Sequence, residues 1–139
     1  MLSLIDYKEF IYNLLDKYNF IISTIEPKEN KDFVENRNDY SLVINGRINF
    51  IDNSFLDVRE YIVFEDQKLF TKKYAYQYQK DEIIKIFRYD NVPHWPNIKT
   101  FPEHKHNFLS KSDEPGILEE SYNISLSKVF KEISTIISL

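Results

Sequence analysis

The chain has 139 residues, a formal net charge of −4, an aromatic content of 16%, three histidines and no cysteine. This length is typical of one domain with one hydrophobic core, here residues 1–139, and the lack of cysteine excludes disulfides and thiolate metal sites and suits a cytoplasmic protein. The acidic balance argues against a protein that binds long nucleic acids. Early charges at Asp6, Lys8 and Glu9, and the lack of a long apolar run, lead us to expect neither a signal peptide nor a membrane span.

The N-terminal segment predicts a helix over residues 4–18, followed by a polar loop over residues 27–39. Apolar side chains recur in the first segment at spacings of three and four, which places them on one helix face. These residues are Leu4, Tyr7, Ile11, Leu14, Leu15 and Tyr18. We expect this stripe to face the core.

Residues 40–90 predict an antiparallel meander of about four to five strands. Four segments rich in Ile, Val, Phe and Tyr are separated by short polar breaks, at residues 52–54, 66–67 and 80–81. Asn45-Gly46 is either a hairpin turn or a kink within one long strand. We favour the kink, because the residues before it are too few for a strand of their own.

A long connection over residues 91–117 precedes a second helix. Its prolines and aromatics favour an ordered segment, and loops of this length in compact domains are usually functional or disordered. Ser125 is placed to cap the second helix. The apolar face of that helix carries Leu126, Val129, Phe130, Ile133 and Ile137. The order helix, meander, helix predicts an α+β fold.

All three histidines lie close together in this sequence, at His94, His104 and His106. In an extended segment, His104 and His106 would point to the same side. Two imidazoles beside a cation can catalyse metal-independent transesterification at phosphorus. Two alternatives stay open. The histidines could bind zinc, although their spacing fits no standard metal motif, or they could be exposed loop residues without a role.

Two charged residues end the last strand of the meander. Arg88 and Asp90 have the same parity in the strand, so they could form an ion pair. The pair could simply cap the strand. Alternatively, the guanidinium of Arg88 could bind phosphate while Asp90 orients it or an imidazole.

Tyr74, Tyr76 and Tyr78 alternate along one strand and therefore share one face of the sheet. A two-residue turn at residues 80–81 would place Tyr76 opposite Lys85 and Tyr74 opposite Phe87. We favour packing in a half-buried face over a platform for stacking RNA bases, and keep both interpretations.

The sequence resembles the TumE-like toxins over roughly residues 45–137. The family pattern is an aromatic strand ending in glutamine, then R-Y/W-D-N-A-P-H-H-P-E, then T/N-F-P-H-H-K/V-H. The chain has "YAYQYQ", "RYDNVPHWP" and "FPEHKH" at these places. Trp95 and Glu103 stand where the pattern has histidine.

The resemblance implies a toxin that a cognate antitoxin protein holds silent, with RNA as the substrate of an endonuclease. His104 and His106 would share acid–base work, with His94 as a third participant and Asp90 as an orienting group. The phosphate would be held by Arg88 and Lys105, and RNA would be contacted by Tyr76, Tyr78 and Lys85. We expect no cofactor and no membrane partner. The chain could also form a homodimer. The alternative is a non-enzymatic module that binds protein or nucleic acid through residues 91–111.

Overall fold

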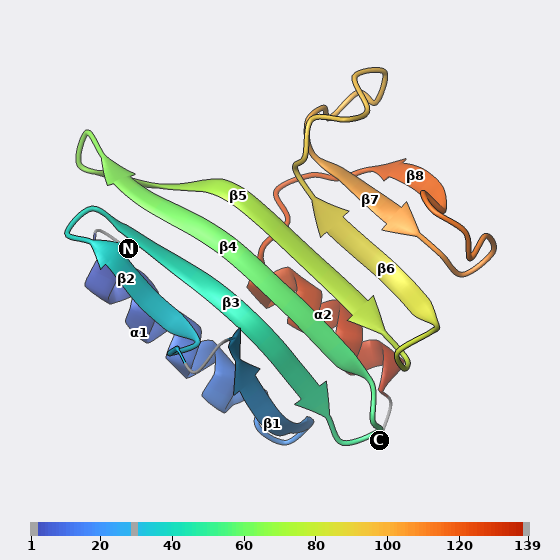
Figure 1. The fold of residues 1–139 in the computed structure, drawn as a ribbon, viewed down its shortest axis with the longest axis horizontal. Helices are drawn as coiled ribbons and strands as arrows, with labels where there is room; N and C mark the ends of the chain where they lie inside the picture. Colours follow the sequence, from blue (N-terminus) through green and yellow to red (C-terminus); the bar gives the residue numbers. More distant parts are fainter. Residues whose placement is uncertain (1–2, 29–30, 138–139) are drawn as a thin grey trace.

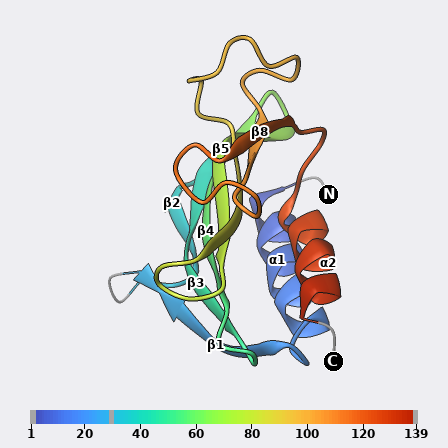
Figure 2. The same ribbon diagram turned by 90° about the vertical axis from the view of Figure 1, so that its right-hand side faces the viewer.

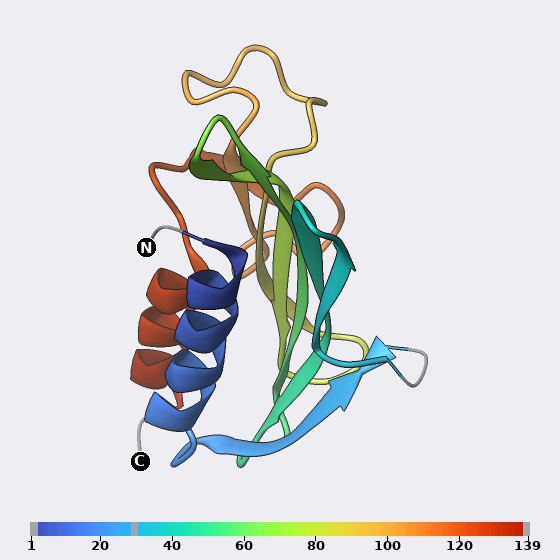
Figure 3. The same ribbon diagram turned by 90° about the vertical axis from the view of Figure 1, so that its left-hand side faces the viewer.

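The computed structural model describes residues 3–28 and 31–137 as two layers. One layer is an antiparallel sheet, and the other contains α1 (Leu4–Lys17) and α2 (Leu126–Ile136). Figures 1–3 show both helices side by side on one face of the sheet, which leaves its other face open. The predicted α+β class and both predicted helices are confirmed.

Within residues 3–28 and 31–137, the sheet has eight strands in the order β1-β3-β4-β5-β6-β7-β8, with β2 paired to β3 off this path. The strands are β1 (Ile22–Pro27), β2 (Val34–Asn38), β3 (Ser41–Phe50), β4 (Phe55–Glu65), β5 (Lys68–Gln79), β6 (Lys85–Asp90), β7 (His104–Asn107) and β8 (Ile117–Glu120). The prediction of four to five strands was therefore too low. The supposed loop over residues 27–39 contains β2, and the long connection after residue 90 contains β7.

The helices are held by their caps and by one shared core. The Ser3 and Ser125 hydroxyls accept the backbone N–H groups of Asp6 and Lys128, which satisfies donors that the first helical turn leaves free. Between the helices, the rings of Tyr18 and Phe130 stack with centroids 5.0 Å apart. Neither described helix is long and apolar enough to cross a membrane.

Asn45-Gly46 lies within the single strand β3, as predicted. The neighbouring strand β1 explains the glycine, because a Cβ at Gly46 would lie 2.6 Å from the carbonyl oxygen of Glu26. A side chain at this position would force the two strands apart. The glycine thus permits close strand approach and is not part of a turn.

The connection between β5 and β6 is longer than the predicted two-residue turn. It spans residues 80–84, where the Asp81 carboxylate accepts the backbone N–H groups of Ile83 and Ile84. The register therefore differs from the expected one. Tyr76 lies opposite Tyr89, and Tyr78 lies opposite Phe87.

Candidate functional site

A buried acid and two buried imidazoles meet on the open face of the sheet, at β6 and β7. Antiparallel pairing sets Asp90 opposite His104 and Arg88 opposite His106. Because side chains alternate along a strand, all four project from the same face. Asp90, His104 and His106 are only 5%, 2% and 3% exposed. The predicted common direction of His104 and His106 is confirmed by their position in β7.

Every ring nitrogen of these two histidines has a partner. Nδ1 of His104 lies 2.8 Å from the carbonyl oxygen of Pro102, and Nδ1 of His106 lies 2.8 Å from that of Pro115. The Nε2 atoms both face Asp90, at 2.9 Å for His104 and 3.4 Å for His106. The two rings meet edge to face with centroids 4.7 Å apart.

Arg88 joins this cluster to a second carboxylate. Its Nε donates to Asp90 at 3.2 Å, which confirms the predicted ion pair, and its Nη2 donates to Glu114 at 2.6 Å. Lys85 also donates to Glu114. The hydrogen bond from Arg88, helped by Lys85, outweighs burial and lowers the pKa of Glu114 to about 2. At neutral pH, Glu114 therefore occupies the outer edge of the guanidinium as an anion.

A hollow of about 440 Å³ opens in front of the cluster. His94 and Trp95 line it from the loop after β6, and Pro115 lines it from the β7–β8 connection. The His94 side chain is exposed, whereas Trp95 packs edge-on against His106 with centroids 6.4 Å apart. Thus all three histidines border one space, but only His94 borders it from an exposed position.

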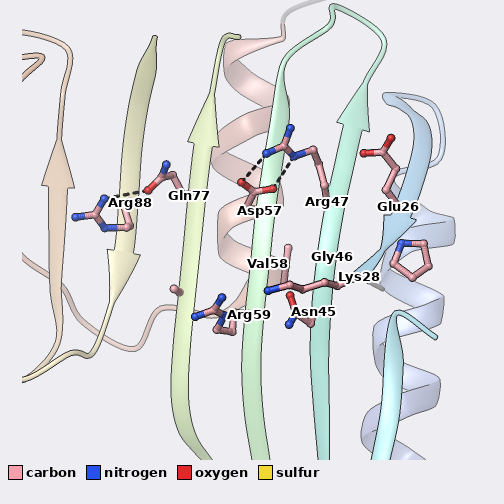
Figure 4. A pocket seen from close by; sticks show the side chains of 12 residues that line it. Glu26, Lys28, Asn45, Gly46, Arg47, Asp57, Val58, Arg59, Gln77 and Arg88 are labelled. Carbon is pink, nitrogen blue, oxygen red and sulfur yellow. Dashed lines mark hydrogen bonds and ion pairs between the residues drawn. The ribbon is translucent and has the colours of Figure 1, made fainter. Parts of the chain in front are cut away.

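A second hollow, of about 520 Å³, continues across the open face toward β1 and shares Ala75 and Arg88 with the first. Figure 4 shows Arg47, Arg59 and Arg88 on this face, with the helices behind the sheet. Arg47 pairs with Asp57 and Glu82. No ion pair holds Arg59 within the described part of the chain. We call the two adjoining hollows the groove, which ends at the histidine cluster. Its lining has four basic side chains (Lys28, Arg47, Arg59 and Arg88) and four acidic ones (Glu26, Asp57, Asp90 and Glu114).

Residues 19–137 match the family model described as toxin TumE. The chain belongs to the TumE toxin family. Membership of the TumE family indicates the toxin component of a toxin–antitoxin system and hence an antitoxin partner. No curated protein and no solved structure matches the chain.

Trp95 and Glu103, the two residues that stand where the TumE pattern has histidine, lie in different surroundings. Trp95 lines the hollow beside His106, whereas Glu103 accepts a hydrogen bond from the Tyr74 hydroxyl at 3.2 Å. Glu103 does not line the hollow that holds the three histidines. Of these two residues, Trp95 is therefore the one that alters the lining of the hollow.

Three residues that the sequence suggested for RNA contact lie on the helix side of the sheet. Tyr76 and Tyr78 are 2% and 0% exposed within the core. Lys105 lies between His104 and His106 in β7, so alternation turns it to the opposite face, where it pairs with Glu132 of α2 at 3.0 Å. The structure therefore separates these three side chains from the histidine cluster, in agreement with the packing interpretation of the tyrosines.

Tyr76 takes part in a buried polar cluster instead. Its hydroxyl and that of Tyr7 donate to the two oxygens of Glu60, which is 1% exposed. Burial raises the pKa of Glu60, and the two hydrogen bonds oppose this only in part. Sequence reasoning missed this cluster and also missed Glu114, because both depend on contacts between distant segments.

Proposed function

We propose that this toxin is an RNA endonuclease that cleaves at the hollow in front of Asp90, His104 and His106. The observation that carries the proposal is the convergence of a buried carboxylate and two imidazoles at the end of a groove lined by arginines. Arg59, which has no ion-pair partner among the described residues, suits a phosphate contact, and a titratable cluster beside the Arg88 cation suits chemistry on a phosphodiester.

The RNA strand would lie along the open face of the sheet. Arg59 has an exposed side chain and would contact the backbone phosphates, while Arg88 would hold the phosphate next to the cluster. Arginine suits this role because its planar guanidinium can donate two hydrogen bonds to one phosphate. A cleft of this size contacts only a few nucleotides, which agrees with the acidic net charge of the whole chain.

The proposed reaction is transesterification at phosphorus. The ribose 2′-oxygen attacks phosphorus after losing its proton, the bond from phosphorus to the 5′-oxygen breaks, and the leaving oxygen takes up a proton. Both ring nitrogens of His104 and His106 are engaged within the protein. We therefore give proton exchange with the substrate to His94 and charge stabilisation around the phosphate to Arg88, which Asp90 of the buried cluster orients.

Induced expression in a bacterial host tests this proposal. Wild type, His94→Ala and Arg88→Gln would be compared for growth and for the integrity of total RNA. Lys131→Ala on the exposed face of α2 is the matched control for loss of a surface cation. We expect arrest with RNA decay for wild type and the control, and neither for the other two at equal levels of folded protein. Arrest without RNA decay would reject the nuclease in favour of a toxin that acts by binding.

A further inference from the structure

The hydrogen bonds of His104 and His106 fix where their protons are. A backbone carbonyl only accepts hydrogen bonds, so the Nδ1 atoms that lie 2.8 Å from Pro102 and Pro115 carry hydrogen. In a neutral imidazole, the other nitrogen is then an unprotonated acceptor. Both Nε2 atoms therefore direct lone pairs at Asp90 if the rings are neutral.

Hydrogen bonds accepted by both oxygens of Asp90 favour its ionised form, which has no proton to donate to either Nε2. Oδ1 accepts the backbone N–H of Val92 at 3.0 Å, and Oδ2 accepts Nε of Arg88 at 3.2 Å. This is the pattern of an ionised carboxylate. With neutral rings, two Nε2 lone pairs thus face the two oxygens of Asp90 in a site that is almost closed to water. Arg88 bonds only Oδ2 from one side, so a cation between the nitrogens and the oxygens would remove the remaining repulsion.

A doubly protonated pair of imidazoles would provide that charge at a high cost. Two cationic rings would stand with their centroids 4.7 Å apart, and like charges at that separation repel each other. Histidines that bind metals show the observed arrangement instead. They donate one ring N–H to a carbonyl or carboxylate and direct the other nitrogen at the ion.

We propose that Asp90, His104 and His106 bind one divalent transition-metal ion of the zinc class. One ligand atom from each residue lies within 4.8 Å of the other two. The two nitrogen–oxygen separations involve different oxygens of Asp90, at 2.9 Å from His104 to Oδ1 and 3.4 Å from His106 to Oδ2. The second matches the roughly 3.4 Å expected between ligands of a tetrahedral ion with bonds of ~2.1 Å, and the first would lengthen when the ion binds. The carbonyls of Pro102 and Pro115 would fix the orientation of the two rings.

This ligand set differs from the three histidines considered from the sequence, because Asp90 replaces His94. Three protein ligands leave a fourth position open, as in catalytic rather than structural zinc sites. The hollow lined by His94 and Arg88 lies in front of the cluster, so the open position would face it. If the proposed RNA cleavage is correct, the ion would polarise the phosphate oxygen there. The binding of the ion does not depend on that reaction.

Metal content and titration of the purified full chain test the proposal. Chelator-treated wild type would be titrated with Zn²⁺ and, separately, with Mg²⁺, which prefers oxygen ligands. We expect one Zn²⁺ per chain and no comparable binding of Mg²⁺. Asp90→Asn should lower Zn²⁺ affinity by more than the ~10–100-fold that loss of an outer partner costs. His94→Ala should keep the stoichiometry, because His94 is outside the proposed ligand set.

Nitrogen NMR of the histidines tests the proposal on the wild-type chain, so the result does not depend on whether a variant folds. We expect Nδ1 of His104 and His106 to carry hydrogen in the apo chain, and both Nε2 signals to shift when one equivalent of Zn²⁺ is added. Two fully protonated rings at neutral pH that do not respond to Zn²⁺ would overturn the proposal, as would Zn²⁺ affinity unchanged by Asp90→Asn. Zinc binding without RNA cleavage would reject only the nuclease, and RNA cleavage by a chain that binds no Zn²⁺ would reject only the metal site.

Discussion

Glu114 reaches across from the β7–β8 connection and holds Arg88, with its Oε1 2.6 Å from Nη2 of the guanidinium. The same guanidinium is bonded to Asp90 and faces the groove. A carboxylate therefore occupies the donors that the proposed site would use for phosphate. Substrate binding must compete with this ion pair.

Replacing Glu114 with Gln should strengthen RNA binding. The change removes a negative charge from the edge of the groove and frees Arg88 for phosphate. Because partly exposed ion pairs contribute about 0–1 kcal/mol, we expect the affinity for a short single-stranded RNA to rise roughly two- to fivefold at low salt. Fluorescence anisotropy at several salt concentrations would measure this. A weaker complex would show that Glu114 orients Arg88 and does not compete for it.

Replacing Arg59 with Ala should weaken RNA binding without affecting the fold. Arg59 has no ion-pair partner among residues 3–28 and 31–137, so its loss leaves no buried charge. The dependence of log affinity on log salt should decrease by about 1, as expected for one lost phosphate contact. Lys131→Ala on α2 removes a cation from the opposite side of the molecule and should leave the slope unchanged. Equal slopes for wild type and Arg59→Ala would place the RNA outside the groove.

Replacing Tyr76 with Phe separates its packing role from the RNA contact suggested by the sequence. The change removes a hydroxyl that donates to buried Glu60, so we expect a loss of about 1–3 kcal/mol in the free energy of unfolding. Tyr78→Phe breaks a bond to the neutral Ser54 hydroxyl and is the matched control, with a smaller expected loss. Urea unfolding would measure both. RNA affinity of the folded Tyr76→Phe chain should match wild type, and a weaker complex would revive the RNA-contact interpretation.

Glu60 should make the stability of the chain depend on pH. Burial raises its pKa above the ordinary value of 4.5, so the folded chain keeps this proton after the unfolded chain has released it. The contribution of Glu60 to the free energy of unfolding therefore falls as pH rises above about 4.5. Glu60→Gln lacks this titration, so its stability relative to wild type should improve with rising pH in urea unfolding. A constant difference between the two chains would show that Glu60 does not titrate over that range.

Much of the fold could be predicted because its long elements carry strong local signals. The two amphipathic helices and the apolar strands β3 to β6 have clear periodicity. The strands β2 and β7, "VENRN" and "HKHN", are short and polar, and they exist because a neighbouring strand supplies hydrogen bonds. The local sequence of a strand does not reveal whether another strand will pair with it. β1 lies at the sheet edge and ends in Pro27, and a proline makes a strand harder to recognise from sequence.

The sequence could predict the site only where the alternation of side chains along a strand determines which residues share a face. The pairing of Arg88 with Asp90, and the common direction of His104 and His106, follow from alternation along β6 and β7. The same alternation should have excluded Lys105, since it lies between two residues that face the site. Glu114 and the carbonyl partners of the imidazoles come from other segments. Their contacts, which led to the proposed metal site, therefore required the structure.

Cleavage of a defined RNA by the purified chain tests the central claim most directly. An end-labelled single-stranded RNA would be incubated with wild type, His94→Ala and Lys131→Ala, with folding checked by circular dichroism. We predict cleavage by wild type and by Lys131→Ala, and a rate roughly 10²–10⁴-fold lower for His94→Ala, the usual cost of losing a general acid or base. Intact RNA with the wild-type chain, or equal rates for all three proteins, would contradict the proposed endonuclease site.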